Sequence, residues 1–451
     1  MNTISAKFAF VMILTVFAGA CEVKSAQDAT APSNGNTVKY VFLFIGDGMG
    51  DNHKILAEQA FQNGHPGARL FMNRLPVQGK TITLNSEKTI TDSAAAGTAI
   101  ACGVKTTNGK LGLDPAGKIV TSIAVIAKQK GMKIGIISTA PLNDATPAAF
   151  YAHVSARGQF KDIVSDMASS GFDFFGGGKL YLDKEMPSSG ADFAQKLKAG
   201  GYTILDGKSG LQAATQAKCY AQTPAYWVID TKNQDIPTLA EYTLKASEIL
   251  NNPNGFFIMV EGGRIDHASH GNDAGTMIQE LFAFDNAVKT GMEFQQKHPD
   301  NTLILVTADH ETGGLTLAED MQPQKAGILK QKASYGVILA DLKQIKDTGK
   351  NFEQAFSLVK DSLGFEGFTP AEQADLNTVW NGNAKDKHKA FLSLAFKIRD
   401  LHCGVKWTTG GHSMTPITTA ASGKGQELFA GNYENIVIFA KLKQLISGCP
   451  P

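Results

Sequence analysis

Cysteine is scarce in this chain of 451 residues, which contains five. No two of them have the close spacing of a C-x-x-C zinc motif, so we expect any metal ion to be held by histidines and carboxylates. Export would permit disulfides, and Cys403 could then pair with Cys449. The sequence does not determine how these two cysteines and Cys219 are connected.

A surplus of charge of either sign is also missing, because 43 Lys and Arg residues stand against 42 Asp and Glu residues. We find no stripe of basic residues, which nucleic-acid-binding domains usually carry. We therefore expect no nucleic-acid partner. The composition, with 43% hydrophobic residues and 46 glycines, is typical of a globular enzyme.

Long apolar runs are missing after the first twenty residues, so no later segment is predicted to be a membrane helix. In residues 1–20 a lysine precedes an apolar stretch that ends in small residues, as in a secretory signal peptide. Cys21 follows directly, and bacterial lipoprotein signals have a cysteine there. The sequence predicts export, either to the periplasm or as an outer-membrane lipoprotein anchored at Cys21, and leaves the choice open. Residues 21–36 are typical of a polar tether.

Four short apolar runs predict buried strands: residues 38–45, 134–138, 256–260 and 302–306. They are rich in β-branched and aromatic residues and lack polar alternation, as expected for strands covered on both faces. Helical patterns lie between them. The sequence therefore predicts an α/β fold, with a doubly wound, mostly parallel sheet flanked by helices. Such sheets bind ligands beyond the carboxyl ends of their strands.

Residues 322–406 differ in character from the rest, being richer in lysine and in amphipathic helical patterns. A helix is predicted to begin after Thr369, because proline follows the threonine and Glu372 completes a capping box. Chemistry-bearing residues resume afterwards, at His412. We therefore expect a helical insertion within one catalytic domain of residues 37–451, although a separate binding domain is the alternative.

Acidic residues follow each of the four predicted strands. Asp47 lies in a Gly-Asp-Gly-Met-Gly turn after the first, Asp144 comes shortly after the second, and Glu261 and Asp309 follow the third and fourth. Each could be no more than a turn residue when taken alone. Because the carboxyl ends of parallel strands meet at one edge, the four loops together predict a metal site.

The densest motif is Glu-Gly-Gly-Arg-Ile-Asp-His-Ala-Ser-His, from Glu261 to His270. Asp266 and His270 are four residues apart, so a helix would place them on one face. Mixed aspartate and histidine ligands suit zinc. Three more candidate ligands lie further along the chain: Asp309, His310 and His412.

Ser93 begins a predicted helix in the segment Thr-Asp-Ser-Ala-Ala-Ala-Gly-Thr. Phosphate binds well at a helix N-terminus, where N–H groups are unpaired, and a serine there could attack a phosphoryl group. Alternatively, Asp92 or Ser93 only caps the helix. Thr146 adds an oxygen donor near Asp144, which suits magnesium, and Arg157 could contact phosphate through two N–H groups.

In order and approximate spacing, these motifs resemble those of the alkaline phosphatases, over roughly residues 38–438 apart from the helical insertion. The most specific signals are Asp-Ser-Ala, Asp-Ala-Thr-Pro-Ala-Ala and Glu-Gly-Gly-Arg-Ile-Asp-His. The resemblance implies hydrolysis of phosphate monoesters to alcohol and phosphate through a covalent phosphoserine. It also implies two Zn²⁺ and one Mg²⁺ as cofactors, and a homodimer as the expected assembly.

The resemblance implies a role for each residue. Ser93 matches the nucleophile, Arg157 the phosphate-binding arginine, and Asp92 the residue that positions this arginine. The zinc ion facing the leaving group would be bound by Asp266, His270 and His412. The second zinc would be bound by Asp47, Asp309 and His310. Magnesium would be bound by Asp47, Thr146 and Glu261. Asp144 would hold water on the magnesium. The role of His267 stays open: it is either a water-mediated phosphate contact or an extra metal ligand.

Other functions fit the sequence less well. Phosphodiesterases and sulfatases resemble the chain at the two-zinc ligands, but diesterases usually carry a threonine nucleophile and lack the third metal site. Sulfatases need a C/S-x-P-x-R motif, in which Ala95 here occupies the place of the proline. A protein that only binds metal or phosphate would be expected to lack Ser93. The natural substrate stays open.

Overall fold

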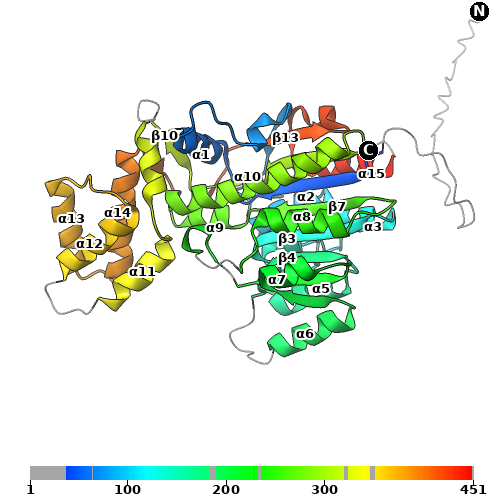
Figure 1. Ribbon diagram of the computed structural model, residues 1–451, viewed down its shortest axis with the longest axis horizontal. Helices are drawn as coiled ribbons and strands as arrows, with labels where there is room; N and C mark the ends of the chain where they lie inside the picture. The colour runs from blue at the N-terminus through cyan, green and yellow to red at the C-terminus, as the bar shows by residue number, and fades with distance from the viewer. Residues whose placement is uncertain are drawn as a thin grey trace, which may run out of the picture. The chain divides into compact units, whose positions relative to one another are not determined.

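The computed structural model describes residues 37–62, 64–181, 189–224, 226–231, 235–318, 323–345 and 351–448. The predicted signal peptide and tether therefore lie outside the described residues. Among those described, ten strands form one central sheet (Figure 1). In spatial order they are β14 (Gly431–Glu434), β2 (Val77–Ile82), β13 (Ile417–Gly423), β8 (Thr302–Ala308), β1 (Tyr40–Gly46), β7 (Phe256–Glu261), β3 (Lys133–Pro141), β4 (Phe174–Gly178), β6 (Cys219–Thr223) and β5 (Thr203–Asp206).

The sheet is mostly parallel, as predicted. β13 runs antiparallel to its two neighbours, β2 and β8, whereas the other described pairings are parallel. The four strands predicted from sequence are β1, β3, β7 and β8, and they lie side by side in the order β8-β1-β7-β3. Their carboxyl ends therefore meet at one edge, which brings together the loops that carry the acidic residues.

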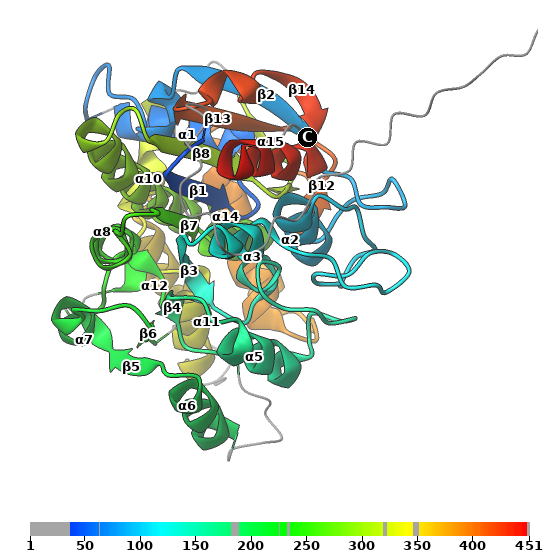
Figure 2. The ribbon, with the colours of Figure 1, turned by 90° about the vertical axis from the view of Figure 1, so that its right-hand side faces the viewer.

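Helices cover both faces of the sheet (Figure 2). One face packs against α1 (Asp51–Gln62), α7 (Gly207–Ala213), α8 (Leu239–Ile249), α9 (Arg264–His270) and α10 (Ala274–Lys297). The other packs against α2 (Ser93–Cys102), α3 (Ile123–Gln129), α4 (Ala145–Ala148), α5 (Phe160–Ser169), α6 (Ser189–Ala199) and α15 (Ile436–Ser447).

Side chains of the central strand β1 alternate between the two cores. Phe42 and Phe44 pack into one core, and Val41 and Leu43 pack into the other, all without solvent exposure. Because both faces are apolar, the sequence of this strand shows a continuous hydrophobic run rather than alternation. The same reasoning explains the runs of its parallel neighbours.

Four further helices surround a separate core at the left of Figure 1. They are α11 (Tyr335–Gln344), α12 (Phe352–Leu363), α13 (Pro370–Asn381) and α14 (Lys387–His402). The capping box predicted at Thr369 and Glu372 is present at the start of α13. The chain enters this region after β10 (Leu315–Leu317) and leaves it at β11 (Val405–Trp407), and these two strands pair antiparallel. The helices therefore form an excursion that starts and ends beside the main sheet.

Three cysteines are buried as free thiols: Cys102, Cys219 and Cys403. Cys449 lies outside the described residues, so its suggested pairing with Cys403 stays a prediction that the free thiol of Cys403 does not support. In the part of the chain that the structure describes, no helix has the length and apolarity needed to cross a membrane.

Candidate active site and metal centre

Asp47, Asp309 and His310 form a buried group at the carboxyl ends of β1 and β8. One ligand atom of each lies within 4.8 Å of the others. His310 Nε2 is 3.5 Å from Asp47 Oδ1 and 3.3 Å from Asp309 Oδ2. Asp47 Oδ1 has no hydrogen-bond partner among the described residues. A buried carboxylate oxygen without a partner is costly, and a cation at this position would satisfy it.

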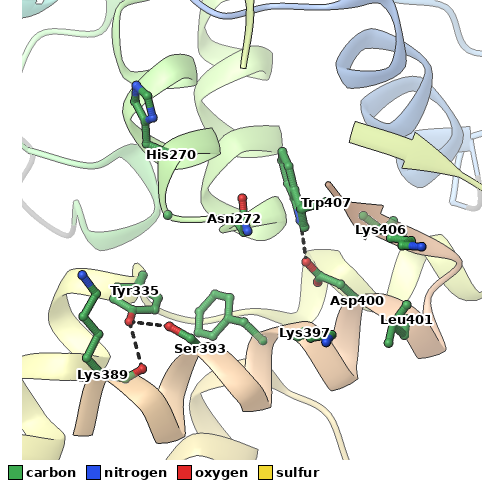
Figure 3. Close-up of a pocket in the computed structure, with 13 residues that line it drawn as sticks. His270, Asn272, Tyr335, Lys389, Ser393, Lys397, Asp400, Leu401, Lys406 and Trp407 are labelled. Carbon is green, nitrogen blue, oxygen red and sulfur yellow. Dashed lines mark hydrogen bonds between the residues drawn. The ribbon is translucent and has the colours of Figure 1, made fainter. Parts of the chain in front are cut away.

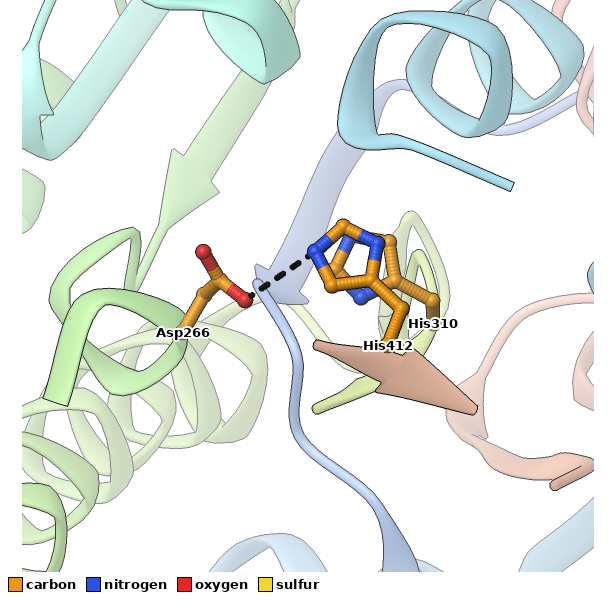
Figure 4. Close-up of side chains that lie close together, drawn as sticks. All are labelled: Asp266, His310 and His412. Atoms are coloured by element: carbon orange, nitrogen blue, oxygen red, sulfur yellow. Dashed lines mark ion pairs between the residues drawn. The ribbon is translucent and has the colours of Figure 1, made fainter. Parts of the chain in front are cut away.

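A second group consists of Asp266, His310 and His412 (Figure 4). His412 Nε2 lies 3.6 Å from Asp266 Oδ1, and the rings of His310 and His412 stack with centroids 3.6 Å apart. His270 lies beside this group, with Nε2 3.3 Å from Asp266 Oδ2 and 3.2 Å from His412 Nε2. The short helix α9 puts Asp266 and His270 on one face. His310 thus belongs to both groups, whereas the sequence assigned it to one.

The oxygen donors predicted for magnesium surround Asp47. Thr146 Oγ1 donates to Asp47 Oδ2 at 3.2 Å and lies 3.5 Å from Asp309 Oδ2. Glu261 is 1% exposed and accepts a hydrogen bond from Ser138 Oγ. Threonine and carboxylate oxygens are ligands that a hard cation prefers.

The buried carboxyl groups at this edge of the sheet favour the binding of cations. Burial raises the pKa of Asp309 to about 7 and that of Glu261 to about 8. Burial, and then the negative charge of Asp309, raises the pKa of Asp47 well above its usual range. Burial also lowers the pKa of His310 well below its usual value. Bound cations would stabilise charged carboxylates and neutral imidazoles, which are the forms that bind metals.

Ser93 is the first residue of α2, and its neighbour Asp92 caps this helix. Ala95 N donates to Asp92 Oδ1 at 2.9 Å, which explains why the helix begins there. The Ser93 side chain is buried, and its Oγ lies 3.2 Å from His310 Nε2. The serine hydroxyl therefore lies at a helix N-terminus and beside the histidine that both metal-ligand groups share.

Arg157 lies between two carboxylates. Its Nη2 donates to Asp144 Oδ1 at 2.9 Å, and its Nη1 is 3.4 Å from Asp92 Oδ2. The Arg157 side chain is 37% exposed, so the guanidinium can still meet an anion. His267 Nε2 lies 3.5 Å from the other oxygen of Asp144. Although burial opposes it, His267 and then Arg157 lower the pKa of Asp144 to about 2.

The structure also brings in residues that sequence reasoning missed. Thr312 Oγ1 donates to Asp266 Oδ1 at 2.5 Å and lies 3.2 Å from His310 Nδ1. The buried carboxyl of Glu311 accepts from Ser413 Oγ and from two backbone N–H groups of the next turn. These residues stand directly beside predicted ligands in the sequence, but adjacency alone does not reveal which neighbour points back to support a ligand.

Comparisons with known proteins identify the family of the chain. The sequence model of the alkaline phosphatase family matches residues 38–447. Alkaline phosphatase 4 of Bacillus subtilis is 30% identical over 460 residues, covering 96% of each chain. The solved cold-active alkaline phosphatase from Shewanella sp. is 30% identical, covering 91% of this chain and 100% of its own, with a TM-score of 0.77. A mutant TAB5 alkaline phosphatase, described with Mg bound in its M3 site, is 30% identical, covering 91% and 99%, with a TM-score of 0.64.

Proposed function

The chain belongs to the alkaline phosphatase family and is a phosphate monoester hydrolase; we propose that it works through a covalent phosphoserine on Ser93, with two zinc ions and one magnesium ion as cofactors. The observation that carries the proposal is the environment of Ser93. This serine begins α2, and its Oγ lies 3.2 Å from the shared histidine His310. A nucleophile at a helix N-terminus and beside metal ligands suits phosphoryl transfer.

The chemistry of the donor sets supports these ions. Asp266, His270 and His412 are mixed nitrogen and oxygen donors, which suit zinc, and Asp47, Asp309 and His310 form a second such set. Asp47, Thr146 and Glu261 offer only oxygen, which suits magnesium. When bound, the ions supply Lewis-acid chemistry, lowering the pKa of the serine hydroxyl and stabilising charge on the departing oxygen.

The residues of the chain perform the displacement in two steps. Ser93 Oγ loses its proton and bonds to phosphorus while the ester oxygen leaves as the alcohol, taking up a proton from solvent. The guanidinium of Arg157, whose side chain is 37% exposed, would hold non-bridging oxygens, and N–H groups at the start of α2 would do the same. Water then attacks the phosphorus and releases phosphate, and Ser93 regains its proton.

Asp92 and Asp144 hold the guanidinium of Arg157 in place for this contact. Asp92 also caps α2, so one carboxylate orients both the nucleophile's helix and the phosphate-binding arginine. We propose that Asp144 additionally holds water on the magnesium ion. His267, whose Nε2 lies 3.5 Å from Asp144 Oδ2, would either contact phosphate through water or act as an extra metal ligand.

The test is the turnover of an aryl phosphate monoester and of the matching diester, with and without a chelator. We expect the monoester to be hydrolysed much faster, the activity to disappear on chelation, and zinc together with magnesium to restore it. A diester rate equal to the monoester rate would contradict the proposal, as would full activity in the chelated protein.

We also propose that residues 1–20 direct export and that two copies of the chain form a homodimer. The N-terminal pattern supports the first statement, and the resemblance to alkaline phosphatases supports the second. Intact mass of protein from the native cell envelope would reveal a diacylglyceryl group if Cys21 is acylated, and simple cleavage would leave an unmodified N-terminus. Light scattering would give twice the chain mass for a dimer.

A further inference from the structure

A cavity of about 710 Å³ lies between the catalytic core and the four-helix excursion. Its walls come from the end of α9, from α11 and α14, and from β11 (Figure 3). This volume falls within the range of small-molecule binding sites. The established activity and the residues described above do not explain why the chain builds such a space.

His270 connects this cavity to the metal-ligand group. It lines the cavity, and its Nε2 lies 3.3 Å from Asp266 Oδ2 and 3.2 Å from His412 Nε2. Its Nδ1 lies 2.7 Å from the carbonyl oxygen of Gly410, so the ring has a defined orientation. In Figure 3 the ring of His270 turns away from α14, which leaves the space between α9 and α14 open. The cavity therefore begins where the metal-ligand group ends.

The charge of the cavity wall is positive. Lys389, Lys397 and Lys406 line it, all are exposed, and none forms an ion pair with a described carboxylate. Asp400 is the only acidic residue among the described residues that line it. Its carboxylate already accepts from Arg399 Nε at 2.6 Å and from Trp407 Nε1 at 2.8 Å. An anionic group entering the cavity would thus meet a wall that carries three lysines and one carboxylate already bound to two donors.

Two aromatic side chains give the cavity flat surfaces with fixed orientations. The Tyr335 hydroxyl lies 3.0 Å from Ser393 Oγ and donates to the Lys389 carbonyl at 3.3 Å. Trp407 is held by its hydrogen bond to Asp400. In Figure 3, Lys389 extends from α14 at the same end of the cavity as His270. A planar ring can stack on such surfaces while its charged substituent meets the lysine.

We propose that this cavity binds the alcohol part of the substrate and favours monoesters whose alcohol carries both a planar ring and a second phosphate, as in a nucleoside bisphosphate. This inference rests on the proposed function, in which the ester oxygen departs toward the zinc bound by Asp266, His270 and His412. An alcohol that leaves past His270 enters the cavity directly.

The test compares kcat/KM of the metal-loaded enzyme for three substrates: adenosine 3′,5′-bisphosphate, adenosine 5′-monophosphate and glycerol 3-phosphate. We expect the bisphosphate to be hydrolysed most efficiently and glycerol 3-phosphate least. The variant Lys389→Glu should lower the ratio of bisphosphate to monophosphate efficiency by about ten-fold, since it replaces attraction with repulsion at the second phosphate.

The matched control is Lys385→Glu, which makes the same change of charge at an exposed lysine just before α14 that does not line the cavity. Its ratio should stay close to that of the wild type. An unchanged ratio in Lys389→Glu, or an equal fall in Lys385→Glu, would overturn the inference. Failure of the wild-type enzyme to hydrolyse any of the three esters would instead refute the proposed function.

Discussion

His310 is the residue at which the two metal-ligand groups meet. It lies within reach of Asp47 and Asp309 on one side and of Asp266 and His412 on the other. Its burial lowers its pKa well below the usual value, so its imidazole is neutral at physiological pH, as metal binding requires. The Ser93 hydroxyl lies 3.2 Å from this ring, which puts the proposed nucleophile next to both groups.

Replacing Ser93, the proposed nucleophile, should lower turnover without changing metal binding. In Ser93→Ala we expect monoester turnover to fall by about a thousand-fold or more, because no other hydroxyl in the proposed mechanism takes over the attack. Zinc content should not change, since Ser93 belongs to neither metal-ligand group. Steady-state kinetics together with elemental analysis measure both effects, and wild-type kinetics in this variant would contradict the assignment.

Replacing Arg157 should show whether this residue binds phosphate or has a structural role. In Arg157→Ser the inhibition constant for inorganic phosphate should rise by about ten-fold or more, because two charge-assisted hydrogen bonds are lost. Arg157→Lys, which keeps the charge but not the fork, should fall between this variant and the wild type. If zinc were lost along with phosphate affinity, Arg157 would have a structural role instead.

At the scale of elements, β9 (Glu311–Thr312) and β12 (His412–Ser413) form a two-stranded sheet that delivers His412 to the metal-ligand group. Ser413 pairs with Glu311 across this sheet, and the Glu311 carboxyl accepts from the Ser413 hydroxyl. β9 follows His310 directly. One cross-strand contact therefore helps to position two histidines that come from distant parts of the chain.

Removing this contact should weaken zinc binding without removing a ligand. In Ser413→Ala we expect zinc affinity to fall by about ten-fold, as is usual when a group that supports a ligand is lost. Competition with a zinc-binding dye measures this. The control is Thr316→Ala in β10. It removes an exposed hydroxyl that donates to the Lys406 carbonyl. Equal zinc affinity in the two variants would show that the cross-strand bond does not position His412.

At the scale of the whole molecule, the sheet gathers four acidic loops at one edge, and this arrangement makes stability depend on metal and pH. In metal-free protein Asp309 and Glu261 keep their protons up to pKa values of about 7 and about 8. In the unfolded chain such groups lose them near pH 4. Asp266 chiefly raises the pKa of His270 from its ordinary value of 6.5 to about 9. Between these two values the folded protein therefore also keeps a proton that the unfolded chain loses.

Through these three groups the folded metal-free protein binds more protons than the unfolded chain, so their contribution to its free energy of unfolding should fall as pH rises from about 6.5 to about 9. Bound cations hold the carboxylates charged, so the metal-loaded protein should show a smaller fall. Urea unfolding midpoints across this range, with and without chelator, measure the difference. A midpoint that rises with pH in the chelated protein would contradict the electrostatic argument.

The predicted fold class and family are confirmed. Both could be predicted because they follow from patterns that are local in sequence. The β1 run shows that both its faces are covered, and the four-residue spacing of Asp266 and His270 places them on one face of α9. The family match over residues 38–447 also favours the monoesterase over the phosphodiesterase and sulfatase alternatives. The roles of the individual site residues stay predictions.

The sequence by itself determined the class of sheet, the acidic loops that follow its strands, and the types of ligand available. Only the tertiary structure decided that His310 belongs to both metal-ligand groups, that Asp144 contacts Arg157, and that a cavity opens beside His270. The physical reason is that these contacts join side chains from segments that periodicity and spacing treat separately. Their distances depend on how strands and helices pack, and packing is a property of the whole folded chain.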